Sequence, residues 1–153
     1  KQCETKYFCI FNADGSFNPS EISGMYNSLK DKGGDIIFGS RYEKNATSED
    51  DTLVTKVGNF IFTKPGKILF RLPITDILYT FVLGNTKKTL DLNLQSQDFA
   101  FCVELPIKAQ RKNYKIFSIP AHERARIAGK KKVNAIRDGL YILKKMIFMF
   151  LKN

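Results

Sequence analysis

An acidic residue and an amide lie two positions apart where an apolar run ends. Residues 7–11 read Y-F-C-I-F, and Asn12 and Asp14 follow, with a glycine directly after Asp14. Such a run predicts a strand that is buried on both faces, and open α/β sheets bind ligands beyond the carboxyl ends of these strands. Because hard divalent cations prefer oxygen ligands and bind nucleotide phosphates, Asp14 is a candidate ligand of Mg²⁺ or Mn²⁺. An ordinary Asp-Gly turn is the alternative.

A helix and a second strand follow this turn. Asn18, Pro19 and Glu21 predict the start of a helix, with Asn18 as the N-cap. Apolar residues at helical spacing then continue to a Gly-Gly pair that ends the helix, and residues 35–38 predict the next strand. This order of strand, helix and strand implies a right-handed parallel crossover. We therefore predict an α/β fold.

The remaining elements are predicted from apolar spacing. They are helices over residues 53–70, 99–111 and 133–153 and a strand over residues 114–119 that a proline ends. Pro65 should kink or divide the first of these helices, and Asp98 should be the N-cap of the second. Three acidic residues at positions 49–51 predict a solvated loop with a helix cap rather than a second metal site.

Three short motifs resemble those of one group of enzymes. Residues 12–19, N-A-D-G-S-F-N-P, resemble the D-x-D segment of GT-A glycosyltransferases, in which a proline opens the following helix. Residues 39–42, G-S-R-Y, resemble the motif after the next strand in the dolichyl-phosphate mannose synthase group. Residues 126–132 are similar to the R-x-x-G-x-S-K segment of that group. The chain departs from the group at Asn12, where the first Asp is usual, and at Lys131, where Ser is usual.

The resemblance covers roughly residues 7–150 and implies a partial GT-A fold. Its sheet would be Rossmann-like and mixed, with flanking helices. A GT-A domain of this kind has a nucleotide-binding βαβ half before the D-x-D strand, so we expect the amino-terminal half to be missing and the sheet edge near residues 7–11 to be exposed. We expect a partial catalytic domain over residues 1–132 and an amphipathic C-terminal helix over residues 133–153.

The resemblance also implies a set of site residues. Asp14 would hold Mg²⁺ or Mn²⁺, and Asn12 would be a weaker, uncharged amide ligand. Arg41, Arg126 and Lys132 would bind phosphate oxygens, the arginines as two-pronged forks and the lysine as a point charge. Each of these cations is otherwise a solvated surface residue.

Two further acidic residues have both a functional and a structural interpretation. Asp76 interrupts an apolar run, where a carboxylate is seldom buried without a partner. It resembles the acidic residue near the D-x-D site of lipid-phosphate glycosyltransferases, and it is our candidate catalytic residue, orienting the acceptor or the ion or acting as a base. The alternative is a helix or turn cap. Glu104 resembles a glutamate in the matching helix of the group, or it is a charge on the helix surface.

The net charge of +10 is concentrated in the last third of the chain. Residues 1–100 contain 12 basic and 12 acidic residues, whereas residues 101–153 contain 13 basic and 3 acidic ones. This asymmetry indicates an anionic partner, either nucleic acid or anionic lipid. The predicted last helix has one apolar stripe, formed by Ile136, Leu140, Leu143, Ile147, Phe150 and Leu151. The apolar run at residues 146–151 between lysines favours a helix that lies in a membrane interface. A core helix, or a helix that leads towards a membrane span, is the alternative. Three cysteines without metal-ligand spacing indicate reduced thiols in a cytosolic setting.

These observations lead to one function and two alternatives. The first hypothesis is a metal-dependent inverting glycosyltransferase at the cytoplasmic face of a membrane, moving sugar from a nucleotide-sugar donor to a polyprenyl phosphate. A glycosyltransferase that acts on a sugar or protein hydroxyl is the runner-up. A non-enzymatic domain that binds nucleic acid or an anionic surface is the other class. No nucleic acid is expected as a partner, since no RNA- or DNA-binding motif is recognisable.

Overall fold

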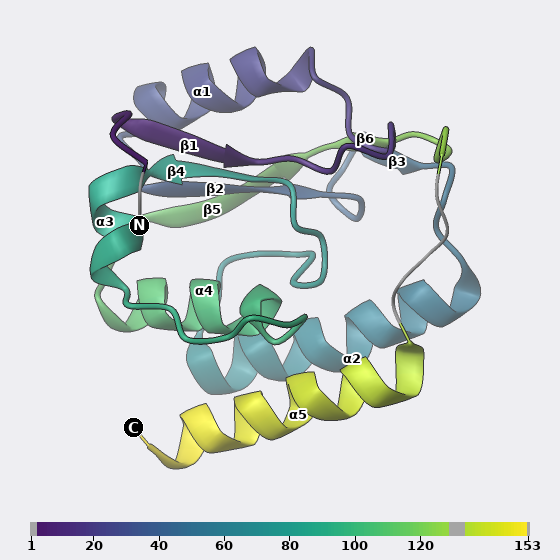
Figure 1. Ribbon diagram of the computed structural model, residues 1–153, viewed down its shortest axis with the longest axis vertical. Helices are drawn as coiled ribbons and strands as arrows, with labels where there is room; N and C mark the ends of the chain where they lie inside the picture. Colours follow the sequence, from purple (N-terminus) through teal and green to yellow (C-terminus); the bar gives the residue numbers. More distant parts are fainter. Residues whose placement is uncertain (1–2, 129–133, 153) are drawn as a thin grey trace.

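The computed structural model describes residues 3–128 and 134–152 and contains a mixed β-sheet between two layers of helices (Figure 1). The strands are β1 (Tyr7–Ile10), β2 (Ile36–Ser40), β3 (Thr47–Ser48), β4 (Val82–Asn85), β5 (Ile116–Pro120) and β6 (His122–Glu123). The helices are α1 (Glu21–Asp31), α2 (Leu53–Phe70), α3 (Thr86–Asp91), α4 (Phe101–Arg111) and α5 (Ala135–Leu151). α1 covers one face of the sheet, and α2, α4 and α5 lie on the other side. The predicted α/β class, with a mixed sheet and flanking helices, is confirmed.

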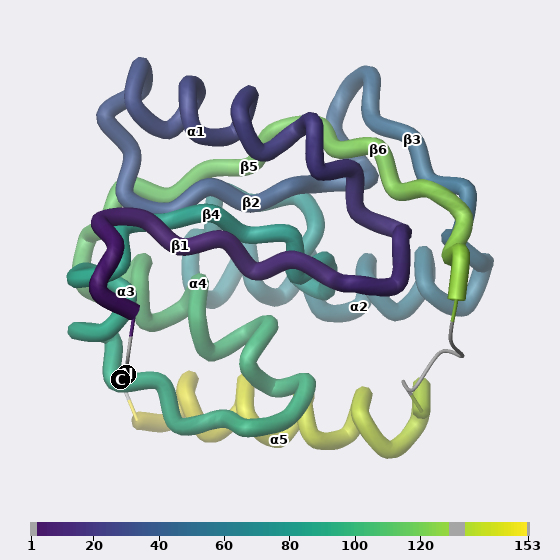
Figure 2. The backbone as a smooth tube through the Cα atoms, turned by 45° about the horizontal axis from the view of Figure 1, so that its top comes forward, coloured from purple at the N-terminus to yellow at the C-terminus, as the bar shows by residue number. Residues whose placement is uncertain are grey.

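The four strands of the main sheet follow the order β1-β4-β2-β5. β2 and β5 are parallel, whereas β4 runs antiparallel to both of its neighbours, β1 and β2. β1 and β2 therefore point the same way, as predicted, but β4 separates them. β3 and β6 form a small parallel pair beyond the end of the main sheet (Figure 2). The carboxyl ends of β1, β2 and β5 consequently lie at the same end of the sheet.

β1 lies at the edge of the main sheet. Each of its four residues is only partly buried, so the prediction of a strand buried on both faces is wrong. An edge strand is bonded to a neighbour on one side only, which leaves its other side accessible. The expected exposed edge near residues 7–11 is therefore present. β2 is instead the strand that is buried along its whole length.

Side chains of β2 alternate between two hydrophobic cores. Ile36 and Phe38 belong to a core between the sheet and α4 and α5, while Ile37 belongs to a second core beneath α1. This alternation follows from the two-residue period of a strand. The second core also contains Phe17 and Tyr79, which come from the segments beside the candidate site. The site is therefore built on well-packed aromatic residues.

Two predicted helix caps are wrong, and a third helix is capped by a residue that the sequence did not single out. Asn18 and Asp98 each accept a hydrogen bond from the amide two residues ahead, and α1 and α4 begin after these turns. Local Asx turns of this kind compete with true capping. In α2 the side chain of Thr52 accepts from the amide of Thr55 and is the cap.

α2 continues through Pro65 as one helix from Leu53 to Phe70, so the prediction that Pro65 divides it is wrong. Proline removes one amide donor, but the helix has buried residues on both sides of it, Asn59 and Thr63 before and Gly66 and Phe70 after. Asn59 and Thr63 have a further role. These two side chains also accept hydrogen bonds from the amides of Leu78 and Ile77, respectively. They hold the segment before β4 against α2.

Glu104 joins three parts of the helical layer. Its fully buried carboxylate accepts hydrogen bonds from the amides of Gln95 and Ser96 and pairs with Lys108 at 2.7 Å and with Lys145 of α5 at 3.2 Å. Burial alone would raise the pKa of this carboxyl, but Lys108 and the amides of Ser96 and Gln95 outweigh it and lower the pKa to about 2. Glu104 is thus neither a solvent-facing charge nor part of the cavity described below.

Replacing Glu104 by Gln should destabilise the fold in a pH-dependent way. A folded-state pKa below the ordinary 4.5 means that the ionised carboxylate stabilises the protein above that value and that this contribution is lost as the pH falls towards 2. We expect Glu104→Gln to lower the unfolding free energy by about 2 kcal/mol at pH 7 and by less at pH 3. Urea unfolding at both pH values measures the difference, with exposed Glu4→Gln as control. An equal loss at both pH values would contradict this assignment.

Candidate functional site

A cavity of about 790 Å³ lies at the end of the sheet, where β1 and β2 terminate. Its walls come from the loop after β1, the start of α2, the segment before β4, the loop after β6 and α5. The charged and amide residues of its lining are Asn12, Asp14, Arg41, Asp50, Glu123, Arg126 and Asp138. Ion pairs join Arg126 to Asp14 and Asp50, and Arg41 to Glu123. The apolar part of the lining includes Val54, Phe62, Leu78, Phe99, Cys102 and Ile142. The cavity therefore combines paired charges with an apolar lining.

Asp14 is held in place by its own loop. Its Oδ1 accepts hydrogen bonds from the amide of Ser16 at 3.1 Å and from the Ser16 hydroxyl at 2.7 Å. Its Oδ2 lies 3.6 Å from Nη1 of Arg126. Burial alone would raise the pKa of the Asp14 carboxyl, but the Ser16 bonds and the charge of Arg126 outweigh it, so this pKa is lowered. Asp14 is thus ionised at neutral pH, with exposed Asn12 on the same wall of the cavity.

Arg126 lies between two carboxylates. Nη1 faces Asp14, and Nη2 is 3.5 Å from Oδ2 of Asp50. Its Nε is buried and has no hydrogen-bond partner among the described residues. Asp50 comes from the acidic stretch before α2, which the sequence assigned to a solvated loop. This stretch instead contributes to the site wall, because Asp50 contacts Arg126 and Asp51 accepts a hydrogen bond from the hydroxyl of Tyr42.

Arg41 is buried in an ion-pair network. Its Nε and Nη2 donate to the two oxygens of Asp76 at 2.8 and 3.1 Å, and its amide donates to Asp76 Oδ2 at 3.2 Å. Nη1 lies 3.4 Å from Oε2 of Glu123. The side chains of Arg41 and Asp76 are 6% and 0% exposed. Asp76 is therefore neither a helix cap nor a turn cap, and it is fully paired, as expected for a buried carboxylate.

Two carboxylates and an aromatic ring stabilise the charge of Arg41. Burial alone would lower the pKa of the guanidinium, but Asp76 and Glu123 raise it overall. The ring of Tyr79 lies 4.7 Å from the guanidinium carbon, a distance suited to a cation–π contact. The arginine has five N–H donors, of which three are used by these carboxylates. Two donors are not used by these carboxylates, and Arg41 is among the described residues that line the cavity.

Among the described residues that line the cavity, the acidic ones outnumber the basic ones. Asp14, Asp50, Glu123 and Asp138 line it, against Arg41 and Arg126. In the part of the chain that the structure describes, no three His, Cys, Asp or Glu side chains converge as a ready metal site. The separate carboxylates of the cavity lining fit a Mg²⁺ or Mn²⁺ ion that takes one or two protein oxygens and obtains its other ligands from phosphate and water.

The sequence-predicted residues fall into two groups. Asn12, Asp14 and Arg126 share the cavity wall, whereas Arg41 reaches it while bound to Asp76 behind the wall. Lys132 lies outside the described residues. The sequence missed Glu123, which is bound to Arg41 and to the hydroxyl of Ser48. Its only sequence signal is that it is acidic within an otherwise basic segment.

Replacing Arg41 by Met should cost about 3–5 kcal/mol of unfolding free energy, because Asp76 and Glu123 would stay buried without their cation. Urea unfolding measures the loss. The double variant Arg41→Met/Asp76→Asn should lose less than the sum of the single changes, since one buried charge is removed with its partner. Exposed Arg124→Met is the control. A loss no larger than that of the control would refute the structural role of Arg41.

Comparison with known proteins places the chain near one class of enzyme. No family model matches it. It is 25% identical over 138 residues to an uncharacterized glycosyltransferase of Mycobacterium bovis and to uncharacterized glycosyltransferases of two Mycobacterium tuberculosis strains. These alignments cover 90% of the chain but 62% of each relative, so the chain spans less than two thirds of their length.

Proposed function

We propose that the protein is a glycosyltransferase of the GT-A type that moves a sugar from a nucleotide-sugar donor to a polyprenyl phosphate at a membrane surface. The observation that carries this proposal is the cavity of about 790 Å³ that combines paired charges with an apolar lining. A polyprenyl phosphate likewise has a charged part, the phosphate, and an apolar part, the prenyl chain. The distant likeness to mycobacterial glycosyltransferases supports the transferase part.

Asp14 would hold the divalent ion, Mg²⁺ or Mn²⁺, with Asn12 as a weaker amide ligand. A divalent ion held there would supply positive charge that offsets the charge of the leaving nucleotide. Arg126 and the two remaining donors of Arg41 would bind phosphate oxygens, and Lys132 would add a point charge. Both oxygens of Asp76 are engaged by Arg41, so Asp76 would act as a positioning residue for this guanidinium.

A phosphate acceptor also simplifies the chemistry. A hydroxyl acceptor requires a positioned general base. A phosphate monoester has a second pKa of about 6 and is already largely anionic at neutral pH. Its oxygen can attack the anomeric carbon directly, which gives inversion at that carbon in one displacement. The hydroxyl alternative would need one of the lining carboxylates as its base, and Glu123, for example, already binds Arg41 and Ser48.

The outer faces of α2 and α5 support a membrane location. The apolar stripe predicted on the last helix points to solvent, while the opposite side of α5 is buried through Asp138, Ile142, Met146 and Met149. α2 packs on α5 and is similarly apolar outside. The exposed apolar residues are Leu53, Val54, Val57, Phe60, Ile61, Ile68 and Leu69 on α2 and Ile136, Leu140, Tyr141, Leu143, Ile147, Phe148, Phe150 and Leu151 on α5.

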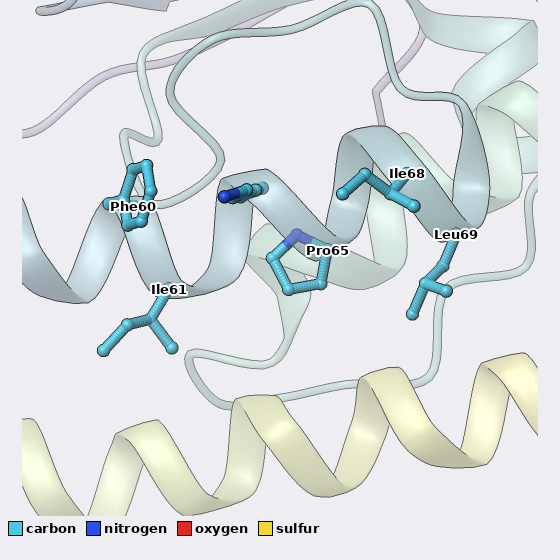
Figure 3. Close-up of a pocket in the computed structure, with 6 residues that line it drawn as sticks. Phe60, Ile61, Pro65, Ile68 and Leu69 are labelled. Atoms are coloured by element: carbon cyan, nitrogen blue, oxygen red, sulfur yellow. The ribbon is translucent and has the colours of Figure 1, made fainter.

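A shallow apolar groove of about 400 Å³ runs along α2 (Figure 3). Its lining includes Phe60, Pro65 and Ile68, with Lys64 as the one charged member. The two helices expose several lysines and Arg137, and their sole acidic residue, Asp138, is buried. This combination suits an anionic bilayer surface. Within residues 3–128 and 134–152, no helix has both the length and the apolar composition needed to cross a bilayer.

Transfer to lipid should be measurable directly. Full-length protein is given radiolabelled nucleotide-sugars, Mn²⁺ or Mg²⁺, and either polyprenyl phosphate or soluble sugar alcohols, and the products are extracted into organic solvent. We expect label in the organic phase only with polyprenyl phosphate and metal. Asp14→Ala should abolish this transfer, while Asn12→Ala should reduce it less, since an amide contributes no charge to the ion. Label on the soluble hydroxyl acceptors alone would sink the proposal and favour the hydroxyl alternative.

Membrane binding should depend on both helices. In flotation with anionic liposomes, we expect Leu140→Glu/Ile147→Glu on α5 and Phe60→Glu/Ile68→Glu on α2 each to reduce binding, because each pair places charge on the apolar face. Raised salt should weaken the binding of the unmodified protein. Leu90→Glu on α3 is a matched control, since Leu90 is also an exposed leucine. Flotation that is unchanged in both double variants would exclude this surface.

A further inference from the structure

Arg126 occupies the space next to the carboxylate oxygen that a divalent ion would need. Oδ1 of Asp14 is engaged by Ser16, so Oδ2 is the oxygen that remains for a ligand. Nη1 of Arg126 lies 3.6 Å from that oxygen. Within the described residues, this guanidinium is the cation paired with Asp14. The same oxygen thus serves an internal cation in the structure and would serve an external one under the proposed function.

The contact between Arg126 and Asp14 is loose. Its length of 3.6 Å, and the 3.5 Å to Asp50, exceed the roughly 2.7–2.9 Å of a strong charge-assisted hydrogen bond. The three side chains are 21–25% exposed. A loose, partly solvated pair is easily exchanged. Nε of Arg126 is buried and has no partner within residues 3–128 and 134–152, so it could donate a hydrogen bond to a phosphate oxygen if the guanidinium turned towards it.

The backbone fixes Arg126 beside Asp14. The amide of Ile127 donates to the carbonyl of Asp14 at 2.9 Å, and the amide of Arg124 donates to the carbonyl of Ser16 at 2.9 Å. Between these bonds Gly15 has a φ of +86°, and a Cβ there would lie 2.7 Å from the side chain of Ile127. The two loops are therefore in close contact at a position that favours glycine. A shift of one loop would therefore displace the other.

From this geometry we infer that, before ligands bind, the guanidinium of Arg126 occupies the position beside Oδ2 of Asp14 that the divalent ion would take. Two cations cannot share Oδ2 of Asp14 without repulsion, so an ion binds weakly while Arg126 is there. A phosphate group removes the conflict, because its oxygens accept from the guanidinium and also ligate the ion. Metal and phosphate therefore strengthen each other's binding, and by linkage the coupling is reciprocal. The inference rests on the metal role proposed for Asp14.

Binding of Mn²⁺ alone tests the inference without any sugar transfer. Equilibrium dialysis of full-length protein, with bound Mn²⁺ measured by electron paramagnetic resonance, gives its affinity. We expect Arg126→Gln, and likewise Arg126→Ala, to bind Mn²⁺ alone about three- to tenfold more tightly than the unmodified protein. Arg124→Gln removes one charge from the same loop, away from Asp14, and should change the affinity less. Circular dichroism confirms that each variant is folded.

The double variant Asp14→Asn/Arg126→Gln should lose the gain in affinity, which would place the effect at Asp14. Persistence of the gain in this variant would overturn the inference. So would a folded Arg126→Gln or Arg126→Ala variant whose affinity for Mn²⁺ is unchanged or lower. A protein that shows the expected shift but transfers no sugar would refute the proposed function and leave this inference standing.

The source of the phosphate is identified in a second set of measurements. GDP, UDP or farnesyl phosphate is held at equal concentration on both sides of the dialysis membrane while Mn²⁺ binding is measured. We expect at least one of these compounds to strengthen Mn²⁺ binding by the unmodified protein and to have less effect on Arg126→Gln. A nucleoside diphosphate effect assigns the coupling to the donor, and a farnesyl phosphate effect assigns it to the acceptor. No strengthening by any of the three would overturn the coupling.

Discussion

The buried ion pairs of Arg41 are the interaction on which the site depends. Arg41 follows β2, Asp76 precedes β4, and Glu123 belongs to β6, so one guanidinium joins three segments that are distant in sequence. Removing these charges from water costs free energy. The cost is offset because Asp76 and Glu123 accept hydrogen bonds from two sides of the guanidinium group of Arg41. Arg41 and Glu123 line the cavity together with Asp14 and Arg126, so these pairs hold part of its wall in place.

The sequence predicted elements better than their arrangement. Helical spacing indicated α2 and α5, and a short apolar run indicated β2, because these patterns are local. The insertion of β4 between β1 and β2 could not be predicted, since strand pairing depends on contacts between distant residues. The failed caps at Asn18 and Asp98 have a local cause, because both side chains formed turns before their helices began.

The candidate site shows the same limit. Motif resemblance selected Asp14 and Arg126, and the structure brings them together although they are more than a hundred residues apart. It could not identify Glu123 or Asp50, whose roles come from the parallel pairing of β3 with β6 and from the loop that follows β3. Their significance depends on which segments the sheet order brings into contact. The division of the chain into residues 1–132 and 133–153 stays a prediction.

The two faces of α5 connect the site to the proposed membrane surface. One face contributes Gly139 and Ile142 to the cavity, and α2 contributes Gly58 and Phe62 opposite. A Cβ at Gly58 would meet nothing within 4 Å, so the absence of a side chain there leaves free space in the wall. The other faces of both helices are apolar and exposed. Under the proposed function, a lipid chain in the cavity and the lipids of the bilayer would thus contact opposite sides of the same two helices.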